Sequence, residues 1–358
     1  MNSLGKIAPF DFQEDYDNSG LIIGNPEEIV TGVLLVLDVT ESVLEEAKSL
    51  GFNLIISHHP LIFKGIKQIT PSCRTGSLVM KAIANNISVI AMHTNFDNVP
   101  EGVNAGLAKV LELQNLSILQ PKGGLLKKLV TFCPVSAVSD VRTALFEAGA
   151  GHIGNYDSCS YNTEGYGSFR AGKDANPYIG EVGKLHFEPE TRIETVYPGH
   201  CERRIVEALK KAHPYEEVAY DLYQLQNQHE HIGAGMIGDL QEIMDGKQFL
   251  TFVKQRMELK AVRFAGNLAK EFKRIAICGG SGAFLIKDAI KAGAQAYVTG
   301  DIKYHEFFDY GEQILLIDAG HYETERYSIS LLSDYLTEKF STFAVLISKI
   351  NTNPVGYF

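Results

Sequence analysis

The chain has 358 residues, 45% of them hydrophobic and 21% charged, which is typical of globular domains with a core of normal size. This length predicts two or three domains. The formal net charge of −10 excludes a protein whose main task is to grip nucleic-acid phosphates, and we expect no direct DNA binding.

The cysteines and the apolar segments indicate the cellular compartment of the protein. Five scattered cysteines without a CxxC pair fit neither a disulfide framework nor a thiolate zinc site. The first residues lack the apolar core of a signal peptide, and no apolar run reaches the roughly 18 residues of a membrane span. We therefore expect a cytoplasmic protein without a membrane partner.

The first third of the chain alternates short apolar runs with helical patterns. Strands are predicted at 32–38, 53–60 and 87–94, and helices at 40–51, 75–86 and 103–113. Regularly spaced βα units predict a parallel, doubly wound sheet.

The pattern changes near Pro121. The predicted order is a strand, a helix, a hairpin or long loop, one or two strands, a helix and a strand, at 127–134, 139–149, 152–170, 182–198, 200–213 and 216–225. The order β-α-β-β-α-β is that of a split βαβ, ferredoxin-like module.

After this module the α/β pattern returns. Helices are predicted at 248–257, 283–293 and 324–340, and strands at 274–282, 294–301 and 313–318. We therefore predict a two-lobed, discontinuous α/β core formed by residues 1–122 and 231–358, with an inserted α+β domain at 123–230.

Histidines and carboxylates follow three of the predicted strands. His58 and His59 end the run "NLIISHHP", and Asp97 follows the strand at 87–94. His321 and Glu325 are four residues apart where a helix begins, so their side chains face the same way. Open α/β sheets carry their sites at the carboxyl ends of strands.

The number of these side chains bears on the kind of site. Each histidine alone is more simply explained as a structural residue. If the five converge, their nitrogen and oxygen ligands suit two metal ions about 3.5–4 Å apart. Without a thiolate, zinc, iron(II), manganese or cobalt is favoured.

Other residues near strand ends have more than one interpretation. His93 is our preferred acid or base. His305 with Asp301 forms an acid/base pair or an outer layer that orients metal ligands, or else Asp301 is a helix N-cap and His305 a surface residue. Asp17 either lines the pocket or makes an Asx turn. The loop "GGSG" at 279–282 either cradles a phosphate or is a tight turn.

At these stretches the chain resembles the Ngg-one-interacting-factor-three-like family, also called GTP cyclohydrolase 1 type 2 homologues. The matching stretches include "EDYDNSGLIIG", "ISHHPLIFKGIKQI", "AMHTNFDN", "HPYEEVAYDLY", "AICGGSGAFL", "TGDIKYHEFFD" and "LIDAGHYETE". The resemblance implies a dinuclear centre, an insert like the PII and CutA folds, and a homohexameric ring. Carried over residue by residue, it implies the metal ligands His58, His59, Asp97, His321 and Glu325.

Two functions remain open at this point. The first is a metal-dependent hydrolase acting on a small, nucleotide-like substrate, with two divalent metal ions (Zn, Fe or Mn) per chain and proton transfer by His93 or a carboxylate. Lys303 and Arg326 are candidates for contacts with an anionic substrate. The second is a metal-binding, metal-delivery or regulatory protein without turnover.

Overall fold

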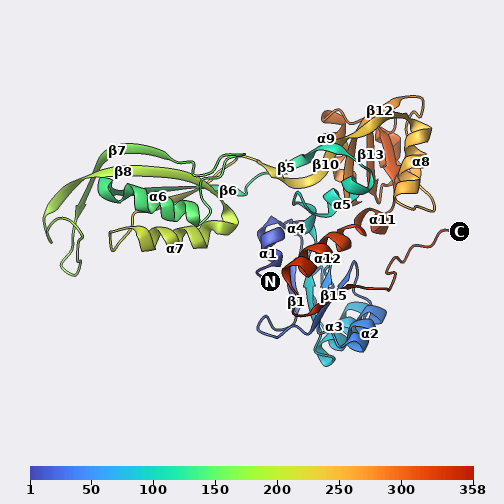
Figure 1. Cartoon of the computed structure of the whole chain (residues 1–358), viewed down its shortest axis with the longest axis horizontal. Coiled ribbons are helices and arrows are strands. Elements are labelled where there is room, and N and C mark those ends of the chain that lie inside the picture. The colour runs from blue at the N-terminus through green and yellow to red at the C-terminus, as the bar shows by residue number, and fades with distance from the viewer. The chain divides into compact units, whose positions relative to one another are not determined.

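The computed structural model describes all 358 residues, which form two compact units (Figure 1). The core unit comprises Met1–Pro121 and Glu230–Phe358, and the insert unit comprises Lys122–His229. The predicted mixed α/β architecture is confirmed, with three sheets and helices packed against them. None of the helices combines the length and the apolar character needed to cross a membrane.

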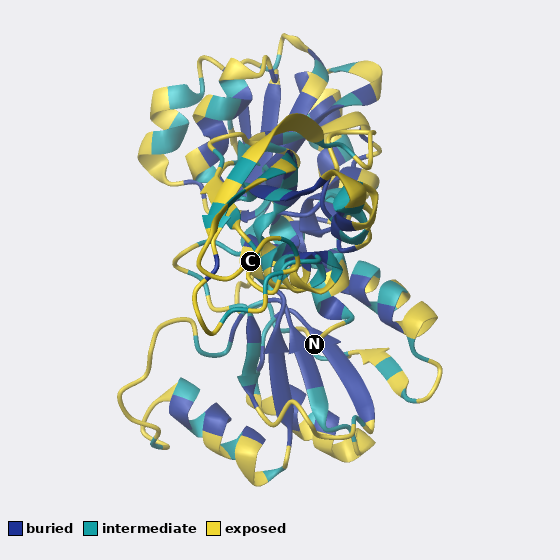
Figure 2. Ribbon diagram, turned by 90° about the vertical axis from the view of Figure 1, so that its left-hand side faces the viewer, coloured by how far each residue is buried: buried dark blue, intermediate teal, exposed yellow.

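The first sheet of the core unit has the order β1-β4-β3-β2-β15. Its strands are Gly20–Ile23, Ser88–Ala91, Leu54–Ser57, Gly32–Val36 and Ala344–Ile347, in that order. The last four are parallel, whereas β1 runs antiparallel to β4, so the predicted all-parallel sheet is wrong at this edge. The central strands are buried almost along their whole length (Figure 2).

Helices that pack on this sheet include α2 (Glu41–Leu50) and α3 (Arg74–Ala84). Helix α2 begins where predicted because the hydroxyl of Thr40 accepts a hydrogen bond from the Val43 amide. It ends at Gly51, whose φ of 71° is a left-handed conformation that glycine adopts freely.

The second sheet has the order β11-β14-β13-β12-β10-β5. Its strands are Arg263–Ala265, Leu315–Asp318, Ala296–Gly300, Glu271–Ser281, His229–Asp245 and Gln114–Lys122, in that order. Strands β12, β13 and β14 are parallel, and β10 and β11 are antiparallel to their neighbours in that group. Its helices are α5 (Val103–Val110), α8 (Gly246–Arg256), α9 (Ile286–Lys291) and α10 (Tyr304–Tyr310).

Short helices follow the strands that carry the candidate residues. Helix α4 (Thr94–Asp97) comes after β4, and α11 (His321–Glu325) comes after β14. The single helix predicted at 324–340 is two helices, α11 and α12 (Ser328–Lys339), and α12 packs against β2 and β15. The amino-terminal residues form α1 (Leu4–Ile7) and a 3₁₀ turn, Phe10–Phe12.

The insert unit is an antiparallel sheet with the order β7-β8-β6-β9 and two helices. In chain order its elements are β6 (Leu126–Pro134), α6 (Val138–Glu147), β7 (Tyr161–Arg170), β8 (Leu185–Pro198), α7 (Glu202–Ala212) and β9 (Tyr220–Gln224). Apolar side chains of both helices and of β6 and β8 form one core. This is the strand order of the split βαβ module. The 152–170 segment is a loop followed by the long strand β7, which pairs with β8 over ten positions.

Candidate metal centre

The carboxyl ends of strands from both sheets of the core unit meet at one cluster of polar side chains. Strand β3 ends at Ser57 and is followed by His58 and His59. Helix α4 brings Asp97 to the cluster, and helix α11 brings His321 and Glu325. The structure thus brings together all five residues that the sequence predicts as metal ligands.

Glu325 lies at the centre of this cluster. Its carboxylate oxygens are 3.5 Å from His58 Nε2, 3.0 Å from His59 Nε2 and 3.3 Å from His321 Nε2. Asp97 Oδ1 is 3.7 Å from His58 Nε2. The His58 side chain is fully buried and that of Glu325 is 4% exposed, so these charges and dipoles lie largely outside bulk water.

The residues present fit a metal ion. His58 Nε2 and Asp97 Oδ1 are buried and have no hydrogen-bond partner, which is costly unless another group satisfies them. The Nε2 atoms of His59 and His321 are 3.2 Å apart, close to the roughly 3.4 Å that separates two nitrogen ligands of one tetrahedral zinc. The ligand atoms of His59, His321 and Glu325 all lie within 4.8 Å of one another, and so do those of His58, His59 and His93, so either group could hold an ion.

Each predicted ligand histidine is oriented through its other ring nitrogen. Nδ1 of His58 lies 2.8 Å from the backbone carbonyl of Met92. Nδ1 of His59 lies 2.8 Å from Asp38, and Nδ1 of His321 lies 2.7 Å from Asp301. When Nδ1 donates these hydrogen bonds, the lone pair on Nε2 is directed into the cluster, as metal-ligand histidines require.

Contacts within the cluster shift the pKa values of His59, His321 and Glu325 toward the charged forms. Burial opposes the protonation of His59, but hydrogen bonds to Asp38 and Glu325 outweigh it and raise its pKa to about 10. The same balance, with Glu325 and Asp301 as partners, raises the pKa of His321 to about 9. Burial alone would raise the pKa of Glu325, but the surrounding imidazoles hold it well below its ordinary value. A metal ion must therefore displace protons from imidazoles.

A glycine admits Glu325 to this position. Gly280, at the end of β12, has a φ of 63°, and a Cβ built on it would lie 2.1 Å from Glu325 Oε1 and 3.3 Å from His321 Nε2. Any larger residue would therefore occupy the space of the carboxylate, and its backbone would be strained. The glycine loop predicted at 279–282 serves this close approach.

His93 lies beside the cluster and is held by Asp17. Its Nδ1 is 2.7 Å from Asp17 Oδ1, and its ring centroid is 5.2 Å from that of His58. Asp17 also accepts a hydrogen bond from the Thr94 amide. Burial would raise the pKa of Asp17, but the hydrogen bond with His93 and the other contacts lower it, so the carboxylate is ionised. Asp17 also accepts a hydrogen bond from the Asn18 amide, does not line the cavity beside the cluster, and orients His93.

The remaining predicted residues lie elsewhere. His305 is exposed on α10, where its ring contacts Tyr304, and it does not line the cavities beside the cluster. Its partner in the prediction, Asp301, is the residue that orients His321. Arg326 is bound to Glu258 and to the Met257 carbonyl.

Two residues of the site were missed by the sequence reasoning. Asp38 follows β2, and the rule that sites lie at strand ends could have identified it. Thr352, in the segment after β15, has a hydroxyl that donates to Asp38 Oδ2 at 3.0 Å. No local pattern marks Thr352, because its role depends on the path of the chain.

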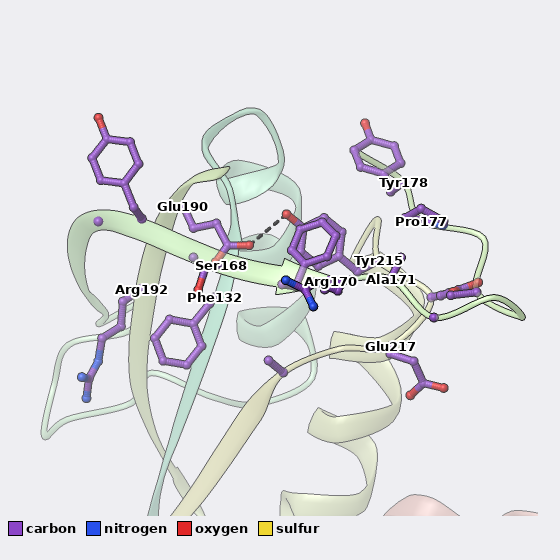
Figure 3. A pocket seen from close by; sticks show the side chains of 18 of the residues that line it. Phe132, Ser168, Arg170, Ala171, Pro177, Tyr178, Glu190, Arg192, Tyr215 and Glu217 are labelled. Carbon is purple, nitrogen blue, oxygen red and sulfur yellow. Dashed lines mark hydrogen bonds between the residues drawn. The ribbon is translucent and has the colours of Figure 1, made fainter. Parts of the chain in front are cut away.

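The core unit has a cavity of about 420 Å³ beside the cluster, and His59, His93, Asp97, His321 and Glu325 are among its lining residues. The insert unit has a larger cavity of about 700 Å³ (Figure 3). Phe132, Arg170, Tyr178 and Tyr215 line this second cavity, and the Tyr215 hydroxyl donates to Glu190 at 2.8 Å. Its lining contains glutamates but no histidine, cysteine or aspartate.

Comparisons with known proteins match nearly the whole chain to a single family. The profile of the Duf34/NIF3 (NGG1p interacting factor 3) family matches residues 1–354. A relative from Bacillus subtilis, named GTP cyclohydrolase 1 type 2 homolog, is 38% identical over 98% of this chain and 96% of its own. A Bacillus cereus protein related to NIF3 has a crystal structure that matches with a TM-score of 0.84 at 39% identity, covering 100% and 97% of the two chains. The structure of Staphylococcus aureus protein SA1388 matches with a TM-score of 0.79 at 34% identity, with the same coverage.

Proposed function

Because the chain belongs to the Duf34/NIF3 family, we propose that its core unit holds two divalent metal ions, zinc, iron or manganese, and hydrolyses a small, nucleotide-like substrate. The ligands are His58, His59, Asp97, His321 and Glu325. The observation that carries this proposal is the position of Glu325, with three imidazole Nε2 atoms within 3.5 Å of one buried carboxylate. A carboxylate with two oxygens can serve two ions at once.

The residues of this chain have separate tasks in such a reaction. A pair of metal ions supplies a water of lowered pKa and polarises the bond under attack. His93, with Nδ1 held by Asp17, is oriented to carry a proton on Nε2 between water and the leaving group. Asp38 and Asp301 keep their histidines in the tautomer that binds metal. His305, exposed on α10, is given no part in this mechanism.

The first experiment is elemental mass spectrometry on the wild type and on His59→Ala. We expect about two metal ions per chain in the wild type and a sharp fall in the variant. His305→Ala is the matched control, because it removes an exposed imidazole outside the cluster, and it should retain the wild-type content. No bound metal after incubation with zinc, manganese or iron(II) would refute the proposal. Hydrolysis is then assayed with each metal.

One observation favours a second function. The cavity of the insert unit is larger than the one beside the histidines, and its lining is mainly aromatic and aliphatic with a few charged groups. Such a cavity suits a bound small molecule. It supports the alternative of a regulatory or metal-delivery protein without turnover. Rapid exchange of both metals with a chelator, together with no hydrolysis of any substrate, would favour this alternative.

Two further properties stay predictions: the homohexameric ring that the family resemblance implies, and the cytoplasmic location that the cysteine pattern indicates. Light scattering coupled to size-exclusion chromatography tests the first. A mass equal to one chain of 39.5 kDa would refute it.

A further inference from the structure

Three aromatic rings line the mouth of the cavity beside the histidine cluster. They are Tyr16, Phe63 and Phe284, and they are 65%, 41% and 61% exposed. The ring centroids of Tyr16 and Phe63 are 6.2 Å apart, and Phe63 lies 5.9 Å from the ring of His93. Tyr16 and Phe63 thus connect solvent with His93 at the cluster. Exposed aromatic faces of this kind stack on flat ligands.

Neither lysine nor arginine accompanies these rings in the lining of this cavity. An adjoining cavity that shares His59 and His321 contains Arg263, but its guanidinium is bound to Asp318 and to the Ile302 carbonyl. Lys303, which the sequence suggests as a contact for an anionic substrate, lines neither cavity. A phosphorylated ligand would therefore find no lysine or arginine to bind it in this cavity.

The glycine loop does not replace the missing cations. A phosphate cradle needs free backbone N–H groups. The amide of Gly279 donates to Asn104, that of Gly280 to Thr324, and that of Gly282 to the hydroxyl of Thr299. The three donors are used inside the protein, so the loop is a structural turn.

The charges around the cluster also disfavour a phosphorylated ligand. Five carboxylates belong to it or orient its histidines, namely Asp17, Asp38, Asp97, Asp301 and Glu325. Two divalent ions would bring four positive charges against these five negative ones. The loaded site would then have no net positive field to attract a triphosphate.

We infer that the substrate is an uncharged, planar cyclic amide, such as a nucleobase-like ring without phosphates, which stacks between Phe284 and the Tyr16–Phe63 pair. This rests on the proposed function, because it assigns the substrate class of the same metal centre. The reaction adds water to the ring: the water oxygen bonds to the carbonyl carbon and the C–N bond breaks. One water proton passes to the leaving nitrogen, with His93 as carrier. The products are a carboxyl group and an amine, without oxidation or reduction.

The test measures binding separately from turnover. Calorimetry on the zinc-loaded protein, with free zinc buffered, compares hypoxanthine and inosine with inosine 5′-triphosphate, and guanosine with GTP. We expect the uncharged members to bind at least tenfold more tightly than their triphosphates. Equal or tighter binding of the triphosphates, or no binding of any ring, would overturn the inference. In either case, a protein that still binds zinc would keep the proposal of a metal centre. A protein that fails to bind zinc would refute both the metal centre and the substrate class.

Three variants sharpen this test. Phe284→Ala should weaken inosine binding at least fivefold, whereas Phe308→Ala, at a phenylalanine that is 76% exposed on α10, should leave it unchanged. Ser281→Lys places a cation at the cavity wall and should raise the affinity for inosine 5′-triphosphate at least tenfold without changing that for inosine. Equal effects of the two phenylalanine variants, or no gain from the new lysine, would overturn the inference.

Discussion

The close approach of Gly280 to Glu325 allows a quantitative prediction about Gly280→Ala. The added Cβ would stand 2.1 Å from Glu325 Oε1, so the carboxylate must retreat by about 1.3 Å to reach an ordinary contact of 3.4 Å. Metal sites tolerate deviations of about 0.2 Å in ligand distance. We therefore expect Gly280→Ala to lower zinc affinity at least tenfold, measured by competition with a chromophoric chelator.

The backbone contributes a second effect that a matched control removes. Alanine in a left-handed conformation costs about 1–2 kcal/mol, and each kcal/mol lowers Tm by about 2–4 °C in a unit of this size. Gly293 has a similar φ of 76°, but a Cβ there would meet nothing within 4 Å. Gly293→Ala should thus lose comparable stability and keep its metal. If Gly280→Ala also binds zinc with wild-type affinity, the argument that this glycine makes room for the ligand is wrong.

Three further predictions concern the same centre. Zinc uptake at pH 7 should release protons, because pKa values of about 10 and 9 keep His59 and His321 protonated whereas ligand imidazoles must be neutral. The apparent affinity for zinc should therefore rise with pH until about pH 9–10. Calorimetry in buffers of different ionisation enthalpy measures the proton release, and finding none would contradict this prediction. Thr352→Val removes the hydroxyl that binds Asp38 and should weaken zinc binding up to about tenfold, whereas Thr352→Ser should not; equal affinities in the chelator assay would refute the orienting role. Replacing 122–229 by Asn-Gly should join the neighbouring strands β5 and β10 in a hairpin and retain the metal, so loss of metal from a folded, shortened chain would show that the insert supports the site.

The parts of the site that follow local rules could be predicted from the sequence. His58 and His59 come directly after a buried apolar run, and Asp97 lies in the short helix after the next one; the carboxyl ends of parallel strands share one edge of a sheet. The i, i+4 spacing of His321 and Glu325 also has a local meaning, since α11 begins at His321. These signals need no knowledge of the distant chain.

The parts that depend on long-range pairing could not be predicted in the same way. Strand β15 joins the first sheet beside β2, more than 300 residues earlier, and no periodicity announces this pairing. The antiparallel direction of β1 is also set by its partner β4. His305 is four residues after Asp301, the same spacing as between His321 and Glu325, yet its side chain is exposed on α10. Spacing alone does not fix which face of a helix meets the site.

The separation of the ligands along the chain has a consequence for biosynthesis. His59 and His321, whose nitrogens nearly touch, are 262 residues apart, with the insert unit between them. A ribosome adds about 5–20 residues per second, so the first three ligands emerge many seconds before the last two. During that interval the nascent chain offers an incomplete ligand set. If these residues bind metal as proposed, loading is a late event of synthesis, and a chain truncated before β14 should bind metal poorly even if its first sheet has folded.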